Sequence, residues 1–402
     1  MATGRGNIIV RIAAVLLAVM LSLVPSSTLR QPPERVSSGD AMPFSSFSKT
    51  LRKIADRFPG DRSDRSLSFP FDHGIHPDVP TEIWEFTGQM NTPDGHRYGF
   101  LLSFTRFGLQ PEQPERPSAW ATRDVYRGLF AFLDASNGHY RASERFARAA
   151  LGMSGYDPVS GLVWLDDWKL RVPLGETTSF ALQADTDGTQ LNLRLEARKP
   201  AVVPAGQSFP AAAGGRLRAY LLSRMAISGT VRLGEHRHKV TGEAWLSRSW
   251  GKLAPPGGQL VLNRYQLQLD DGREFLFFQL RRKDGSALPH LTIYPGQRKD
   301  GSAPPVSSGL LIESDGRVVP ISGNDVRLEP ATYWSNPSGV PYPVGWIVRL
   351  PKLEAELRLS PLVEDQEIVR SVRAWSGAVS VSGAGPRGKA LSGRGFVELA
   401  GY

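Results

Sequence analysis

Hydrophobic and polar positions alternate along most of the chain beyond residue 66, with the period of two that is typical of β-strands. The clearest strand pair spans residues 83–107, and its returning strand has an aromatic face made by Tyr98, Phe100, Leu102 and Phe104. A second strand pair spans 260–281, and both faces of its returning strand are apolar. Such a strand is expected where one face lines the interior of a barrel and the other face packs against further protein.

Turn signals separate these strands. Asp-Gly dipeptides, which are typical of tight β-hairpin turns, occur at 94–95, 187–188, 271–272, 284–285, 300–301 and 315–316. Helical periodicity is sparse, with its best example at 142–151, and helices do not alternate with strands as they do in a parallel α/β fold. The pattern therefore predicts an all-β protein built from antiparallel hairpins.

The chain also contains an internal repeat. The strand pair at 83–107 resembles the one at 260–281, and a Ser-Gly segment followed by a second Gly occurs in both halves, at 228–242 and at 376–393. A length of 402 residues suits two domains. We therefore expect two related antiparallel β-barrels in tandem, at 66–255 and 256–402.

The N-terminal segment resembles an export signal. Arg5 and Arg11 precede an apolar run of 13 residues, 12–24, followed by small and turn-forming residues. A membrane-spanning helix needs roughly 20 residues, so we expect residues 1–30 to be a cleaved signal peptide, with an uncleaved N-terminal anchor as the alternative. Residues 31–65 then form a linker, and the protein is exported, either to the periplasm or out of the cell.

Composition narrows the functional classes. The chain has no cysteine, which excludes disulfides, thiolate nucleophiles and cysteine-bound metal clusters. The formal charge of +9 is carried by scattered Lys and Arg residues, without the aromatic and basic motifs of nucleic-acid modules. We therefore expect neither a nucleic-acid partner nor a cofactor.

The densest polar segment is 72–85, which contains Asp72, His73, His76 and Glu82. Two histidines with nearby carboxylates could bind a metal ion, but a loop with Gly and Pro does not fix the facing geometry that a metal site needs. The pattern favours histidines that hydrogen-bond to the backbone at a barrel mouth, and we predict no metal.

Two further polar segments are less informative. Asp166 and Asp167 are adjacent, so on a strand they face opposite sides and cannot form an acid pair in one pocket. Ser247 and Ser249 lack the Gly-x-Ser-x-Gly context of a nucleophile elbow, which disfavours serine hydrolysis. Tryptophans near these segments either plug a barrel or line a cavity.

Seven ordered motifs resemble the hydroxyneurosporene synthase and AttH-like family. They lie at 69–78, 81–88, 163–168, 244–250, 267–272, 333–339 and 398–402. The resemblance implies paired lipocalin-like domains, export, an association with ABC transporters and, in one branch, the addition of water to a carotenoid double bond. Where the family has acidic residues or histidine, this chain has Ser247, Arg248, Ser249 and Asn263, and none of these is an acid near neutral pH.

These observations leave two classes of function open. The first is an exported protein that binds a hydrophobic or amphiphilic ligand, such as a lipid or isoprenoid, and serves as an accessory to an envelope ABC transporter. Its predicted ligand-binding residues are His76, Trp84, Trp168, Trp245, Arg248, Trp250, Asn263 and Tyr265. The alternative is an isoprenoid 1,2-hydratase-like or hydrolase-like enzyme, with the predicted catalytic residues Asp72, His73, Glu82 and Asp166.

Overall fold

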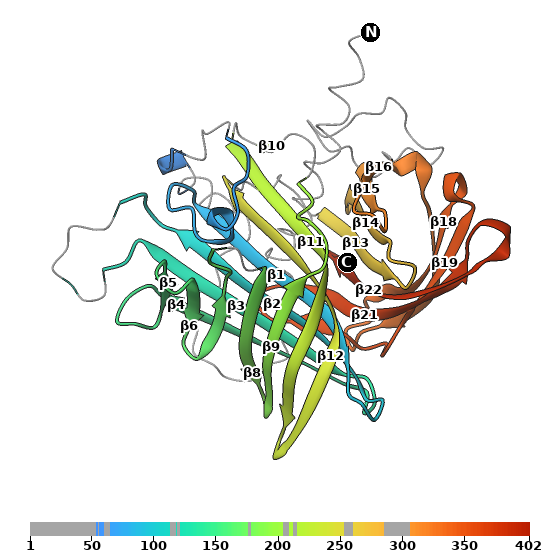
Figure 1. The fold of residues 1–402 in the computed structure, drawn as a ribbon, viewed down its shortest axis with the longest axis horizontal. Coiled ribbons are helices and arrows are strands. Elements are labelled where there is room, and N and C mark those ends of the chain that lie inside the picture. The colour runs from blue at the N-terminus through green and yellow to red at the C-terminus, as the bar shows by residue number, and fades with distance from the viewer. Residues whose placement is uncertain are drawn as a thin grey trace, which may run out of the picture.

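The computed structural model describes two curled antiparallel sheets and almost no helix (Figure 1). It describes residues 54, 56–59, 65–112, 118, 121–175, 178–203, 209–211, 215–252, 260–284 and 306–402. The predicted signal peptide and most of the predicted linker lie outside these residues. Within the described ranges, no helix has the length and hydrophobicity of a membrane span.

Sheet A contains the strands of the N-terminal half. Their bounds are β1 (Thr81–Asn91), β2 (Arg97–Gly108), β3 (Asp124–Asp134), β4 (His139–Arg148), β5 (Ser154–Asp157), β6 (Leu162–Leu165), β7 (Trp168–Arg171), β8 (Ser179–Thr186), β9 (Thr189–Ala197), β10 (Phe209–Ala211), β11 (Gly215–Leu233) and β12 (His236–Gly251). Their order is β4-β3-β2-β1-β12-β11-β9-β8-β7-β6-β5, with β10 paired to β11. β3 and β4, at one end of this order, contact β6 and β8, near its other end. The sheet therefore curls into a near-barrel.

Sheet B contains the strands of the C-terminal half. Their bounds are β13 (Leu260–Leu269), β14 (Glu274–Arg282), β15 (Val306–Ile312), β16 (Val318–Ser322), β17 (Arg327–Ser335), β18 (Pro341–Leu350), β19 (Ala355–Pro361), β20 (Glu367–Val369), β21 (Arg373–Ala384) and β22 (Ala390–Ala400). Their order is β16-β15-β14-β13-β22-β21-β19-β18-β17, with β20 paired to β21. The sheet curls into a half-barrel whose two edge strands, β16 and β17, contain Pro320 and Pro330.

The strand orders confirm the internal repeat. Nine consecutive strands of sheet A, from β4 to β7, follow the same order as the nine from β16 to β17 in sheet B. By this alignment β1 corresponds to β13, β12 to β22 and β11 to β21. The all-β prediction of two related antiparallel units is therefore correct.

Four predicted Asp-Gly turns connect neighbouring strands. The glycines Gly95, Gly188, Gly272 and Gly316 all have positive φ values between 79° and 93°, which glycine adopts without steric cost. The dipeptides at 284–285 and 300–301 do not lie wholly within the described residues. The helix predicted at 142–151 is wrong, because this segment pairs with β3 as β4 and forms one edge of sheet A.

Each sheet curls around its own core. Inside sheet A the largest buried side chains include Trp84, Trp168 and Trp250, and inside sheet B they include Tyr265 and Trp375. Alternate residues of the central strands face the other way and pack the outer faces of the two sheets against each other. We call this contact of β1, β11 and β12 with β13, β21 and β22 the seam.

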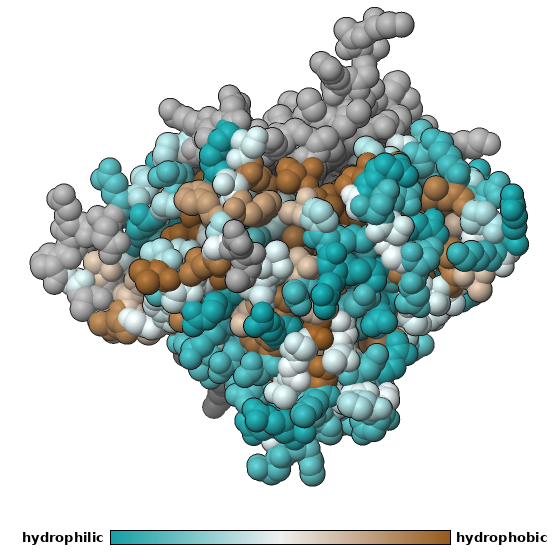
Figure 2. All heavy atoms as spheres, viewed as in Figure 1, coloured by the Kyte–Doolittle hydropathy of each residue, from teal (hydrophilic) through white to brown (hydrophobic). Residues whose placement is uncertain are grey.

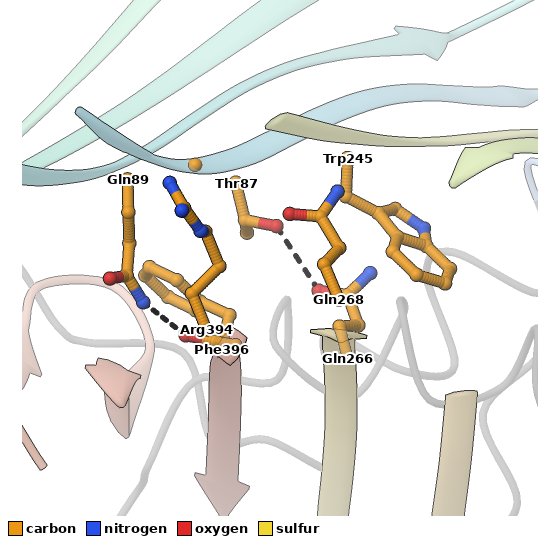
Figure 3. Close-up of a pocket in the computed structure, with 9 residues that line it drawn as sticks. Thr87, Gln89, Trp245, Gln266, Gln268, Arg394 and Phe396 are labelled. Atoms are coloured by element: carbon orange, nitrogen blue, oxygen red, sulfur yellow. Dashed lines mark hydrogen bonds between the residues drawn. The ribbon is translucent and has the colours of Figure 1, made fainter. Parts of the chain in front are cut away.

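The seam is flanked by apolar clusters but has a polar centre (Figure 3). Gln89 Nε2 on β1 donates to the backbone oxygens of Val379 (2.9 Å) and Gly395 (2.8 Å) in sheet B. Its counterpart Gln268 on β13 donates to backbone oxygens in sheet A, those of Ser223 (2.7 Å) and Ala244 (2.9 Å). Each of the two buried amides thus joins its own sheet to the other sheet. We call this pair, Gln89 and Gln268, the glutamine clasp. Beside them lies a cavity of about 10 Å³, with room for about one water molecule.

Two glycines bring neighbouring strands close beneath the clasp. A Cβ on Gly242 would lie 2.0 Å from the backbone oxygen of Gln89, and one on Gly393 would lie 2.3 Å from that of Gln268. Both distances are too short for any side chain. The corresponding positions therefore need glycine for the same steric reason in both halves.

A buried ion triad crosses the seam next to the clasp. Arg264 Nη2 on β13 lies 2.6 Å from Glu85 Oε1 on β1 and 2.6 Å from Glu398 Oε2 on β22. All three side chains are at most 4% exposed. Burial alone would lower the pKa of Arg264, but the two carboxylates outweigh burial and raise it.

We expect Arg264→Met to destabilise the protein by about 3–5 kcal/mol, because it leaves two buried carboxylates without a cation. Arg349→Met is the matched control, since Arg349 also contacts two carboxylates but is 40% exposed and should cost less than about 1 kcal/mol. Urea denaturation measures both free energies of unfolding. Equal losses would contradict the role given to the buried triad.

Candidate functional site

A polar loop between residue 65 and β1 covers one end of sheet A (Figure 1). It includes the short helix η1 (Phe71–His73), and the ends of β1, β2, β11 and β12 contribute side chains beneath it. Charged and polar side chains from these elements form what we call the charged cluster, which consists of Arg65, Asp72, His76, Glu82, Arg106, Asp124 and Arg248.

His76 lies between two carboxylates. Its Nε2 is 2.9 Å from Asp72 Oδ1 and its Nδ1 is 3.0 Å from Glu82 Oε2. Each ring nitrogen therefore faces one carboxylate oxygen. The ring also stacks on Trp250, with a centroid distance of 4.1 Å and an interplanar angle of 1°.

Glu82 is fully buried at the centre of the cluster. Arg106 Nε donates to Glu82 Oε1 at 2.9 Å, and Arg248 Nη2 donates to Oε2. Burial alone would raise the pKa of Glu82, but the charges of Arg106 and Arg248 outweigh burial and hold that pKa well below its usual range. Glu82 is therefore a carboxylate at neutral pH.

Asp72 is likewise stabilised as a carboxylate by its neighbours. Arg65 Nη1 and Nη2 lie 2.8 and 2.5 Å from its two oxygens, and the backbone N–H of Ser68 donates to Oδ2 at 2.5 Å. Burial would raise the pKa of Asp72, but hydrogen bonds from Arg65 and His76 outweigh it and keep that pKa well below its usual range. An ionised carboxylate with these partners does not supply a proton near pH 7.

Arg248 is occupied on both terminal nitrogens. Besides Glu82, Nη2 donates to Gly74 O (2.6 Å) and Nη1 to Ser249 O (2.9 Å). The guanidinium carbon lies 3.9 Å from the centre of the Trp84 ring and 5.0 Å from that of Trp250. The arrangement fixes Arg248 as part of the barrel interior.

A neutral polar pair lies beside the charged cluster. His73 Nδ1 is 2.5 Å from the hydroxyl oxygen of Tyr220 on β11. Burial lowers the pKa of His73 to about 4, assisted by the positive charge of Arg248, and burial raises the pKa of Tyr220 far above its usual range. Both groups are uncharged at neutral pH. Phe69 covers them, with its ring centroid 4.8 Å from that of His73.

The structure brings seven of the residues predicted from sequence to this end of sheet A. Each of the seven contacts at least one of the others: they are Asp72, His73, His76, Glu82, Trp84, Arg248 and Trp250.

The other predicted site residues lie elsewhere. Asp166 occupies an exposed turn between β6 and β7 with a φ of 53°, and Trp168 is in the core of sheet A, where its Nε1 donates to Asp185. Trp245 faces the seam. Asn263 and Tyr265 belong to sheet B, so the structure does not join them to Arg248 in one barrel.

Sequence reasoning missed Arg65, Arg106, Asp124 and Tyr220. Arg106 could have been found, because it is the one charged residue of the sequence 100–107, and a charged residue within a buried strand is unusual unless it is paired. Its partner Glu82 is its direct cross-strand neighbour. Tyr220 gave no such signal, because its contact with His73 joins residues 147 positions apart.

No group of three or more His, Asp or Glu side chains that could hold a metal ion occurs among the described residues. In the charged cluster, the carboxylate oxygens already accept hydrogen bonds from arginine and histidine. The cluster is therefore built as an ion-pair network.

The model of the AttH-like family matches residues 61–290 and 288–402. A putative AttH from Nitrosomonas europaea is similar in structure, with a TM-score of 0.67 and 25% identity over 84% of this chain and 98% of that one. Kievitone hydratase from Nectria haematococca has a TM-score of 0.57 and 14% identity over 85% of this chain and 95% of that one, which shows a shared fold. No curated protein matches the chain.

The buried His73 predicts a pH dependence of stability. Its pKa is about 4 in the folded protein and about 6.5 in an unfolded chain. As the pH falls below 6.5, the unfolded chain takes up a proton that the folded protein does not, so stability falls by about 2 kcal/mol between pH 6.5 and 5. Urea denaturation at the two pH values measures this loss.

His73→Gln removes the titrating ring and should remove most of this loss. His139→Gln, at an exposed position at the start of β4, is the control and should behave as the wild type. If His73→Gln loses as much stability as the wild type does, the buried neutral state of His73 is wrong.

Proposed function

The chain belongs to the AttH-like family, and from this premise we propose that it binds a hydrophobic or amphiphilic small molecule, a lipid or an isoprenoid, at the end of sheet A that η1 covers. The observation that carries the proposal is the exposure of two aromatic side chains in this loop. Phe69 is 41% exposed and Phe71 is 61% exposed. Both lie against the buried polar groups described above.

The exposed rings offer apolar surface to a ligand. Figure 2 shows hydrophobic surface gathered around this end of sheet A. Covering a phenylalanine side chain removes apolar area from water, and full burial is worth about 1.5–3 kcal/mol. An isoprenoid or acyl chain lying on Phe69 and Phe71 gains part of this free energy.

The neutral pair supplies a polar anchor. Tyr220 occupies Nδ1 of His73, and among the described residues no hydrogen bond engages Nε2. Because both residues are uncharged, they suit a hydroxyl head group that both donates and accepts. Arg248 does not favour an anionic head group, since Glu82 and backbone oxygens occupy its terminal nitrogens.

The same geometry argues against a hydratase-like reaction. Protonation of an alkene needs an acid, and both Asp72 and Glu82 are held as carboxylates. Kievitone hydratase shares the fold at 14% identity, which supports no transfer of its activity. Binding without conversion is therefore the better-supported function, and the charged cluster contains no serine or threonine that could act as the nucleophile of a hydrolase-like reaction.

We also propose that the chain is exported and acts beside an ABC transporter of the envelope. The leader-like segment at 1–30 supports export, and the transporter rests on family association alone. Cell fractionation tests the first proposal and copurification of a membrane complex tests the second.

Titration of the purified protein with farnesol, an isoprenoid alcohol, tests the binding function. We expect saturable binding at one site and a roughly tenfold weaker affinity for Phe71→Ser, which removes much of the apolar contact. Phe146→Ser is the matched control, because Phe146 on β4 is 55% exposed but is not part of the loop that contains η1. Isothermal titration calorimetry measures the affinities.

Two outcomes would overturn the proposal. One is the same affinity for Phe71→Ser and the wild type. The other is a hydrated farnesol product in the reaction mixture, detected by mass spectrometry, which would restore the hydratase hypothesis.

A further inference from the structure

The interior of sheet B differs in charge from that of sheet A at corresponding positions. Glu82 on β1 pairs across strands with Arg106 and Trp250. In the register that matches Gln89 to Gln268, its counterpart on β13 is Val261, which pairs with Arg281, and the counterpart of Arg248 on β22 is Leu399. The repeat therefore places uncharged side chains in sheet B where sheet A has Glu82 and Arg248.

Three buried polar atoms inside sheet B make no hydrogen bond of good geometry with the described residues: Arg373 Nε, the hydroxyl of Tyr265 and the indole Nε1 of Trp346. Arg373 faces Glu367, and the Asn263 side chain acts on the Tyr265 hydroxyl as a donor, which leaves the hydroxyl proton without an acceptor. The side chains of Tyr265 and Trp346 are 0% and 3% exposed. The two rings meet edge to face with centroids 5.3 Å apart. A buried donor without a partner costs about 1–3 kcal/mol, so two adjacent ones in one interior point to an absent acceptor.

Burial raises the pKa of Tyr265 well above its usual range. Its hydroxyl therefore keeps its proton and remains a donor. The indole of Trp346 is a donor only. Both groups therefore need a hydrogen-bond acceptor, such as an oxygen atom.

Aromatic side chains continue from this pair towards the edge of the sheet. Trp334 on β17 stacks on Tyr342, and Tyr342 lies against Tyr402, with centroids 6.1 and 5.4 Å apart. Trp334 and Tyr402 are partly exposed. β17 is an edge strand of the open half-barrel, so these rings form an apolar row between the edge of the sheet and its interior.

We propose that the concave side of sheet B is a second binding site, for an uncharged molecule that presents a carbonyl oxygen to Tyr265 and Trp346. A long-chain ester or ketone has this chemistry. The inference does not depend on the function proposed for sheet A.

The charges nearby favour an uncharged ligand over a carboxylate. Arg373 faces Glu367 at 3.7 Å, and Glu367 also accepts from the Tyr342 hydroxyl at 2.9 Å. Arg281 lies over the ring of Tyr402 at 5.9 Å and is exposed. A buried carboxylate would thus lack a free cation beside the two donors, and its desolvation would oppose binding.

Titration of the full protein with methyl octanoate and with octanoate tests the site. We expect the ester to bind more tightly than the acid. Tyr265→Phe and Trp346→Phe should each weaken ester binding by about threefold to tenfold, which is the effect of one neutral hydrogen bond. Tyr342→Phe is the matched control, since its hydroxyl is already paired with Glu367, and it should change the affinity less than twofold.

A second measurement keeps the test valid if a variant fails to fold. In the wild-type protein with ¹⁵N-labelled tryptophan, the Nε1–H resonance of Trp346 should shift on addition of methyl octanoate. No ester binding by the wild type, unchanged affinity in folded Tyr265→Phe and Trp346→Phe, or an unmoved Trp346 resonance would overturn the site. Phe71→Ser should leave ester binding intact, which separates this result from the farnesol test.

Discussion

The reciprocal glutamine clasp at the seam is the interaction on which the arrangement of both sheets depends. Each sheet has an outer apolar face that cannot remain in water, but apolar contact alone does not fix how two curved sheets align. Gln89 and Gln268 fix it, because each reaches two backbone oxygens of the other sheet. A shift along the seam would leave these buried amides unpaired, at a cost of about 1–3 kcal/mol for each unsatisfied group.

The two halves of the repeat match more closely at the seam than in the interiors of the two sheets. At the seam, corresponding positions keep the same residue or a complementary one, as with Gln89 and Gln268 or Glu85 and Arg264. In the interiors, corresponding positions hold chemically different residues, since Glu82 is matched by Val261 and Arg248 by Leu399. The repeat thus preserves the joint between the two halves while it gives each half a different chemical interior.

Much of the fold could be predicted from the chain because strand alternation and Asp-Gly turns are local signals. The predicted helix at 142–151 failed because β4 is an edge strand whose side chains are half-exposed, so its alternation is weak. The motif at 72–85 located the charged cluster, since its residues are close in sequence. The sequence did not reveal that Tyr220 contacts His73, or that Arg248 and Asn263 belong to different sheets. Both facts depend on the sheet to which a strand belongs and on the face to which its side chains point.

The prolines in the edge strands of sheet B have a consequence for behaviour at high concentration. An unpaired strand edge can recruit a strand from another molecule and begin aggregation. Pro320 and Pro330 each remove one backbone donor from such an edge, and the ladder of β17 is irregular beside Pro330. The half-barrel can therefore stay unclosed, available to a small molecule, while resisting edge-to-edge polymerisation with its own copies.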